Sequence, residues 1–190
     1  MKSTLKNMVL VLGIITLVAS GAVAGVFILT KSPIAQAKTD KINVAIADVM
    51  PSFDNDPAAE KLTKSVDGQT INIYPAKSGK KIIGYAIETF SKKGFGGQMS
   101  LMVGMLIDGT INKISVIEHK ETPGLGDKID KAKSDFSVQF EGKNPSEFQL
   151  LVTKDGGDVD AITASTISSR AYCDALERAA KIFNDLKANS

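Results

Sequence analysis

The sequence feature that most constrains this chain is an uncharged apolar run of 22 residues, from Met8 to Leu29. As an α-helix with a rise of about 1.5 Å per residue, this run spans about 33 Å, enough to cross the hydrocarbon core of a bilayer. Lys2 and Lys6 precede the run, and the positive-inside rule favours a cytoplasmic N-terminus. The sequence therefore predicts a cytoplasmic tail over residues 1–7 and a single transmembrane helix over residues 8–29.

A cleaved signal peptide is the alternative interpretation of the same run. Ala35-Gln36-Ala37 has the small-x-small pattern of a cleavage site. The apolar run is longer than the core of a signal peptide, however, and Lys31, Ser32 and Pro33 separate it from that site. These features favour an uncleaved anchor, followed by a linker over residues 30–40 and an extracytoplasmic domain over residues 41–190.

The composition of the remaining chain excludes several functional classes. The first 37 residues contain three lysines and no acid, so the rest holds 20 basic and 21 acidic residues. This near-neutral domain has no electrostatic footprint for nucleic acid. Cys173 and His119 are the only residues of their types, so this chain has no ligand set for a zinc site or an iron–sulfur cluster. Redox chemistry would therefore require an organic cofactor.

The first half of the domain contains one clear hairpin pattern. Residues Ile71–Tyr74 and Ile82–Thr89 alternate between apolar and polar side chains, and the turn Lys77-Ser78-Gly79-Lys80 separates them. The preceding segment, 38–69, has a mixed pattern that fits either a short strand or an irregular helix.

A second hairpin follows in the sequence. Apolar side chains alternate from Gln98 to Ile107 and again from Ile111 to Ile117, on either side of Asp108-Gly109. Asp-Gly between alternating runs is among the strongest local hairpin signals. The glycines of Lys92–Gly97 fit either a mobile hairpin loop or a close approach of ligand to backbone. The centre of the domain is therefore predicted to be an antiparallel sheet.

The last third of the chain is predicted to be mainly helical. A charged segment, 128–140, has an apolar stripe that favours a helix, and residues 149–153 have the pattern of a further strand. The terminal helix should face the core with Tyr172, Leu176, Ala179 and Phe183, and Cys173 beside them is expected to be a small buried residue. The predicted fold class is α+β, with an antiparallel sheet packed with helices after one transmembrane helix.

Two stretches are candidates for a ligand site. In the first, 160–169, hydroxyl side chains gather just before the terminal helix. Ser and Thr are typical helix caps, but unpaired amides and the helix dipole also make a helix N-terminus an anion site. In the second, 119–128, Pro123-Gly124-Leu125-Gly126 forms a bend with little side-chain bulk, which fits a structural turn or a backbone surface for a flat group.

Both stretches resemble the FMN-binding domain family. The resemblance rests on His119-Lys120-Glu121-Thr122-Pro123-Gly124-Leu125-Gly126-Asp127-Lys128 and Asp160-Ala161-Ile162-Thr163-Ala164-Ser165-Thr166-Ile167-Ser168-Ser169. It is strongest to the G subunits of Rnf ion-translocating oxidoreductase complexes and weaker to the C subunits of sodium-pumping NADH:quinone reductases. It implies an electron-transfer flavoprotein subunit of a complex that couples ferredoxin- and NAD-linked electron transfer to sodium or proton movement.

The resemblance also implies a covalent cofactor. In this family a flavin transferase joins FMN through its phosphate to the last threonine of an Asp-x-x-Ser/Thr-Gly-Ala-Thr motif, which corresponds to Thr166. Asp160 and Thr163 occupy fixed motif positions, Ala164 replaces the usual glycine and Ser165 the usual alanine. Ser168 is expected in the same site. The flavin ring is expected against a loop made of Glu121, Thr122, Pro123, Gly124, Leu125 and Gly126.

The resemblance further implies the setting in which this chain works. It implies a location in the bacterial inner membrane, other membrane subunits as partners, and redox activity only within the complex. The C subunit of the quinone reductase is the first alternative. The second is a non-redox, membrane-anchored binding module in which Ser165 and Thr166 only cap a helix.

Overall fold

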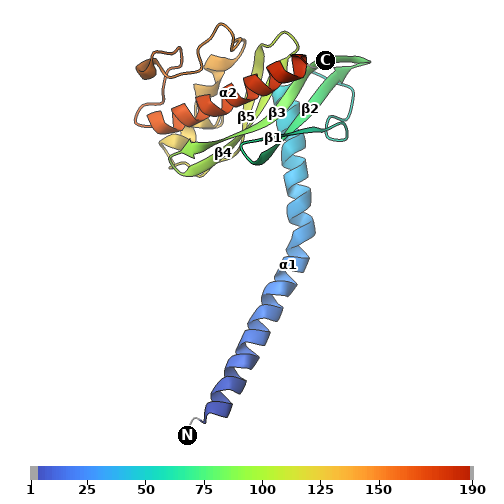
Figure 1. Cartoon of the computed structure of the whole chain (residues 1–190), viewed down its shortest axis with the longest axis vertical. Helices are drawn as coiled ribbons and strands as arrows, with labels where there is room; N and C mark the ends of the chain where they lie inside the picture. The colour runs from blue at the N-terminus through green and yellow to red at the C-terminus, as the bar shows by residue number, and fades with distance from the viewer. Residues whose placement is uncertain (1–3, 189–190) are drawn as a thin grey trace. The chain divides into compact units, whose positions relative to one another are not determined.

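The computed structural model describes residues 4–188 and divides the chain into two compact units, Met1–Lys41 and Ile42–Ser190. The first unit consists of most of helix α1, Leu5–Val49, which is labelled in Figure 1. Within the described residues this is the one helix long and apolar enough to cross a membrane, and its large apolar side chains from Leu5 to Leu29 are exposed.

The segment 30–40, predicted as a linker, is helical and belongs to α1. Pro33 lies inside this helix without ending it. The residues after it favour a helix, because Ala35, Gln36 and Ala37 have high helix propensity and the Gln36 side chain donates a 2.9 Å hydrogen bond to Asp40 Oδ1 one turn later.

The last turns of α1 belong to the second unit, where they pack on one face of its sheet. Ala45, Ile46 and Val49 are buried there, with Met50 just after the helix, against a sheet surface formed by Tyr74, Ala76, Ala86 and Met102. Asn112 Nδ2 donates a 2.8 Å hydrogen bond to the carbonyl of Val49, the last residue of the helix. The start of the ambiguous segment 38–69 is therefore helical.

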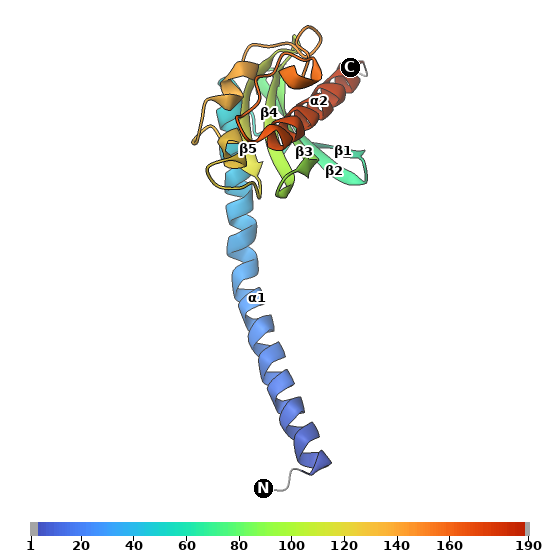
Figure 2. The ribbon, with the colours of Figure 1, turned by 90° about the vertical axis from the view of Figure 1, so that its left-hand side faces the viewer.

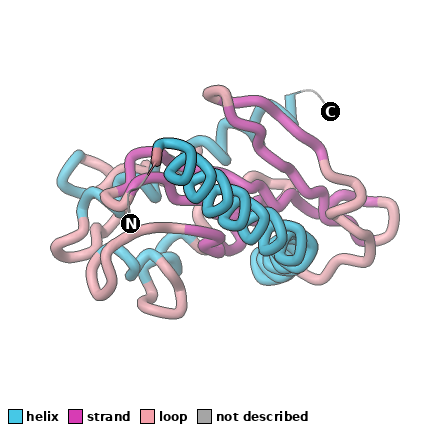
Figure 3. Tube along the Cα trace, turned by 90° about the horizontal axis from the view of Figure 1, so that it is seen from below, coloured by secondary structure: helices cyan, strands magenta, loops and turns pink. Residues whose placement is uncertain are grey.

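The second unit is built on one five-stranded antiparallel sheet, magenta in Figure 3. The strands pair in chain order, so each is joined to its neighbour by a hairpin. Both predicted hairpins are present, and β1 lies in the segment 38–69, whose pattern had left a strand and a helix open. The strands are β1 Leu62–Val66, β2 Gln69–Ser78, β3 Lys81–Gly94, β4 Gly97–Leu106 and β5 Ile111–Glu118.

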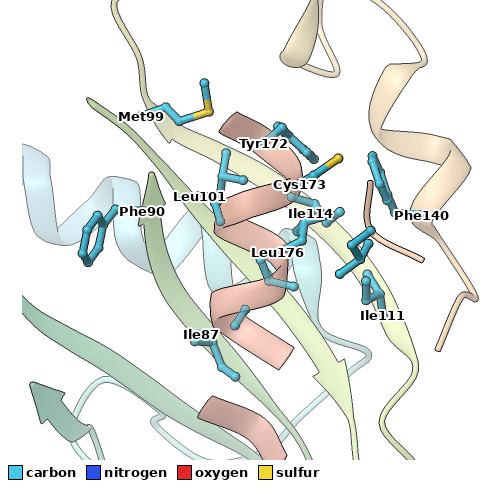
Figure 4. Close-up of a cluster of buried hydrophobic side chains, with 14 of the residues drawn as sticks. Ile87, Phe90, Met99, Leu101, Ile111, Ile114, Phe140, Tyr172, Cys173 and Leu176 are labelled. Carbon is cyan, nitrogen blue, oxygen red and sulfur yellow. The ribbon is translucent and has the colours of Figure 1, made fainter. Parts of the chain in front are cut away.

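Helix α2, Thr166–Ala188, crosses the other face of the sheet (Figures 1 and 2). The predicted core residues Tyr172, Leu176, Ala179 and Phe183 are all buried, as is Cys173. Figure 4 shows Leu176 and Cys173 among side chains from the strands, including Leu101 and Ile114. The sheet and helix are also joined directly, since Thr89 Oγ1 donates a 2.9 Å hydrogen bond to the Ala175 carbonyl.

The predicted helix over residues 128–140 is wrong. The structure has only two short 3₁₀ turns, Gly126–Ile129 and Phe136–Phe140. Between them, Ser134 Oγ donates to the Lys128 carbonyl at 2.6 Å and Asp130 Oδ1 accepts from the Ala132 amide at 2.9 Å. These side chains offer the backbone local partners that compete with helical hydrogen bonds. Of the predicted apolar stripe, Ile129, Phe136 and Phe140 are still buried in the core, whereas Ala132 is exposed.

One smaller prediction is also wrong. Residues 149–153 do not form a strand, because only Val152 pairs, in an isolated bridge with Val159, before the 3₁₀ turn Thr153–Asp155. The Gln149 amide instead binds Asp158 Oδ2 at 2.7 Å, which closes this loop on itself.

Candidate functional site

A pocket of about 350 Å³ lies where three segments meet: the β3–β4 turn, the loop after β5 and the start of α2. More apolar than polar surface lines it. Its lining residues are Phe95, Glu121, Thr122, Leu125, Gly126, Ala164, Ser165, Thr166, Ile167 and Ser168.

Thr166 is the first residue of α2, and its side chain is partly exposed in this pocket. The first intrahelical hydrogen bond runs from the Ser169 amide to the Ser165 carbonyl at 3.1 Å. The amides of Thr166, Ile167 and Ser168 precede that bond, so they have no partner within the helix. The pocket therefore contains a hydroxyl beside a cluster of unpaired helix amides, which attract an anion.

The side chain of Ser169 makes two hydrogen bonds that hold the turn before α2. Ser169 Oγ donates to the Ser165 carbonyl at 3.1 Å and accepts from the Ile162 amide at 3.0 Å. Arg170 makes a two-pronged ion pair with Asp155, at 2.6 and 2.8 Å, and this guanidinium lowers the pKa of the Asp155 carboxyl. These contacts fix the helix start on both sides of Thr166.

Ala164 has a φ of 62°, in the left-handed region that glycine adopts without strain. It is the residue that replaces glycine in the family motif. The backbone of this turn therefore keeps the conformation that a glycine favours, although an alanine occupies the position.

Glu121 is the buried polar centre of the site, with 6% of its surface exposed. Its Oε2 accepts a 2.5 Å hydrogen bond from Ser168 Oγ, and its Oε1 accepts a 3.2 Å hydrogen bond from the Gly96 amide. Among the lining residues in the described range 4–188, Glu121 is the one acidic or basic residue.

Three apolar side chains at this pocket remain open to solvent. Phe95 is 69% exposed, Ile167 is 49% exposed and Leu125 is 44% exposed. Each comes from a different one of the three segments. They provide an apolar surface of the kind on which a flat aromatic group packs.

The structure brings together most of the residues that the sequence proposed for the site. The proposed residues that line the pocket are Glu121, Thr122, Leu125, Gly126, Ala164, Ser165, Thr166 and Ser168. Pro123, Gly124, Asp160 and Thr163 are not among the lining residues. The Gln139 side chain binds the backbone of Asp160, accepting from its amide at 2.8 Å and donating to its carbonyl at 3.2 Å.

Sequence reasoning missed two lining residues, Phe95 and Ile167. The glycines around Phe95 had indicated a possible ligand loop, but not the side chain that contacts the pocket. Ile167 is an apolar residue in the first turn of a helix, and only the fold reveals that it faces the pocket rather than the core.

Neither cysteine chemistry nor a metal centre is indicated by the described residues. Burial raises the pKa of Cys173 to about 12, which keeps this thiol protonated and unreactive. Within residues 4–188 no three His, Cys, Asp or Glu side chains are grouped to hold a metal ion.

Comparison with known proteins supports the resemblance. The FMN-binding domain family matches residues 94–181, a range that contains every residue lining the pocket.

The chain is 35% identical to the G subunit of the ion-translocating oxidoreductase complex of Shewanella baltica over 187 residues, covering 93% of this chain and 88% of that one. It is 36% identical to the G subunit of the same complex in Vibrio atlanticus over 196 residues, covering 97% and 92%. With the G subunit from Cereibacter sphaeroides the identity is 32% over 185 residues, covering 94% and 84%. The chain belongs to the family of G subunits of ion-translocating oxidoreductase complexes, within the FMN-binding domain family.

Proposed function

We propose that this chain is the electron-transfer flavoprotein subunit of a membrane-bound ion-translocating oxidoreductase, and that FMN is joined through its phosphate to Thr166 Oγ1. The observation that carries the proposal is the position of Thr166. It begins α2, lies partly exposed in the pocket and adjoins helix amides that lack intrahelical partners.

The helix start fits a phosphodiester. Such an ester keeps one negative charge, which the dipole of a 23-residue helix and its first amides stabilise. The ester oxygen would come from Thr166, while Ser165 is 7% exposed and is therefore less accessible to a transferase. The residues of this chain fit the phosphate end of FMN without a metal ion.

The apolar side chains fit the ring end of FMN. Phe95, Leu125 and Ile167 offer an apolar surface, and the pocket of about 350 Å³ is near the lower end of the roughly 300–1,000 Å³ of ligand sites. Because these three side chains are open to solvent, a flavin ring that packs on them would keep an accessible edge, where electrons can pass to and from a neighbouring subunit. When bound, FMN supplies one- and two-electron redox chemistry.

The proposed setting follows from the relatives and from α1. The relatives are named as subunits of a complex, and α1 fits a single-pass membrane protein. We assign the partners as other membrane subunits of a ferredoxin- and NAD-linked complex, and a flavin transferase for maturation. The lysines before the apolar run favour a cytoplasmic N-terminus and an extracytoplasmic domain 41–190 in the bacterial inner membrane.

Co-expression with a flavin transferase tests this function. The denatured wild-type chain should fluoresce as a flavoprotein on a gel, and so should Ser165→Ala, whereas Thr166→Ala should not. A wild-type chain without flavin would instead support the non-redox binding module. Purification with subunits of a sodium-pumping NADH:quinone reductase would support the alternative C-subunit assignment.

A further inference from the structure

Three glycines crowd around the Glu121 carboxylate and its loop. A Cβ atom at Gly94 would lie 2.4 Å from the Gly97 carbonyl oxygen and 2.6 Å from Glu121 Oε1. A Cβ atom at Gly126 would lie 2.5 Å from Glu121 Oε2 and 2.6 Å from Ser168 Oγ. A Cβ at Gly96 would collide with the Lys120 carbonyl. None of the three has a positive φ, so space rather than backbone conformation requires glycine at these positions.

These contacts change the interpretation of the glycine-rich segments. The sequence had left open whether these glycines let a ligand approach the backbone or only form turns. The structure instead places Gly94, Gly96 and Gly126 against the segment that contains Glu121, so that its side chain can lie between the β3–β4 turn and α2. Ser168 Oγ binds one oxygen of this carboxylate and the Gly96 amide binds the other.

We propose that Glu121 is the positioning residue of the flavin site. Through its hydrogen bonds with Gly96 and Ser168, Glu121 holds the β3–β4 turn and the first turn of α2 against the loop that follows β5 before the cofactor is attached. Its carboxylate also places a negative charge beside the flavin. This inference rests on the proposed function, because it takes FMN to be the occupant of the pocket.

The charge of Glu121 has a consequence for electron transfer. Reduction of the flavin adds an electron, which a neighbouring redox subunit of the complex supplies, and no atom of Glu121 is transferred. A fixed carboxylate at the pocket opposes the added negative charge by Coulomb repulsion, which buried surroundings screen less than water does. Glu121 should therefore make the flavin harder to reduce.

Redox titration of the FMN-loaded full chain tests the role of the charge. In Glu121→Gln the side chain keeps its size and the amide can still bind Ser168 and Gly96, but the charge is removed. The midpoint potential should shift to a more positive value. Glu118→Gln removes the same charge from an exposed position at the end of β5 and should match the wild type. Equal potentials in Glu121→Gln and the wild type would overturn the proposal.

Amide hydrogen exchange in the flavin-free chain tests the positioning role. Glu121→Ala removes the acceptor for the Gly96 amide, and loss of a hydrogen bond to a charged group should speed exchange there about 10-fold or more. Exchange at the β2–β3 turn, for example at Gly79, should not change. Unchanged protection of Gly96 in a folded Glu121→Ala chain would contradict the positioning role. If this variant does not fold, the potential of Glu121→Gln still decides the proposal.

These outcomes separate this inference from the proposed function. A wild-type chain that acquires no FMN refutes the function itself. A wild-type chain that acquires FMN, with an unchanged potential in Glu121→Gln, refutes only the role of Glu121.

Discussion

The Ser168 hydroxyl donates a 2.5 Å hydrogen bond to Glu121 Oε2, across 47 positions of sequence. Both residues are buried, and they join the first turn of α2 to the loop that follows β5. The two stretches that carry the family resemblance therefore contact each other directly in the fold. The candidate flavin pocket depends on this long-range contact and not on either stretch alone.

Ala164 should be a point of strain that glycine relieves. A left-handed conformation costs an L-residue roughly 1–2 kcal/mol, and the greater freedom of glycine in the unfolded chain offsets about 0.4–1 kcal/mol of that. Ala164→Gly should thus raise the free energy of unfolding by about 0.5–1 kcal/mol, measured by urea denaturation of the detergent-solubilised chain. The exposed Ala132, which lacks a positive φ, is the control, and its change to glycine should lower stability slightly. An Ala164→Gly chain less stable than the wild type would contradict the proposed backbone strain at Ala164.

Tyr172 should tolerate loss of its hydroxyl. The side chain is fully buried, and within the described residues its hydroxyl has no hydrogen-bond partner. Burial also raises the pKa of this phenol well above its ordinary value. Since no hydrogen bond is lost, Tyr172→Phe should be as stable as the wild type or about 1 kcal/mol more stable in thermal or urea unfolding.

Tyr74 provides the matched comparison for Tyr172. Its hydroxyl donates a 3.3 Å hydrogen bond to Glu88 Oε2, so Tyr74→Phe should reduce stability. If Tyr172→Phe were destabilised as much as Tyr74→Phe, the Tyr172 hydroxyl must have a partner after all.

Asp174 should make stability dependent on acid pH. Burial raises its pKa, but hydrogen bonds from Lys93 at 2.5 Å and Ser91 at 2.8 Å outweigh burial, so the net pKa lies below its ordinary value. The stability that Asp174 gains from Lys93 and Ser91 is therefore fully present above the pKa of an aspartate in the unfolded chain, about 4. It is lost as the pH falls through the lower pKa of Asp174 in the folded chain.

Unfolding of Asp174→Asn as a function of pH measures this contribution. The variant should be about 1 kcal/mol less stable than the wild type at pH 7, and the gap should shrink as the pH falls below about 4. Glu147→Gln, at an exposed position, should show no such pattern. A gap between Asp174→Asn and the wild type that stays constant down to about pH 2 would show that the Asp174 charge is not the cause.

Local patterns were enough to predict the hairpins and the terminal helix. Asp108-Gly109 and the alternation on either side of it predicted the β4–β5 hairpin, because turn chemistry and side-chain period act over a few residues. The buried positions Tyr172, Leu176 and Phe183 followed from helical spacing in the same way.

Predictions failed where side chains compete with the backbone or where partners are distant. The segment 128–140 has a helical apolar stripe, yet Asp130 and Ser134 bind nearby backbone groups and prevent a helix. The role of Phe95 in the pocket and the contact of Gly126 with Glu121 depend on the packing of separate segments, which no local pattern encodes.

The most direct test of the central claim is the mass of the peptide that contains Thr166. The full chain should be produced with a flavin transferase, digested with trypsin and analysed by tandem mass spectrometry. We predict one FMN phosphoester on Thr166 in the wild type and in Ser165→Ala, and an unmodified peptide in Thr166→Ala. FMN found on Ser165, or retained by the Thr166→Ala chain, would contradict the proposed attachment.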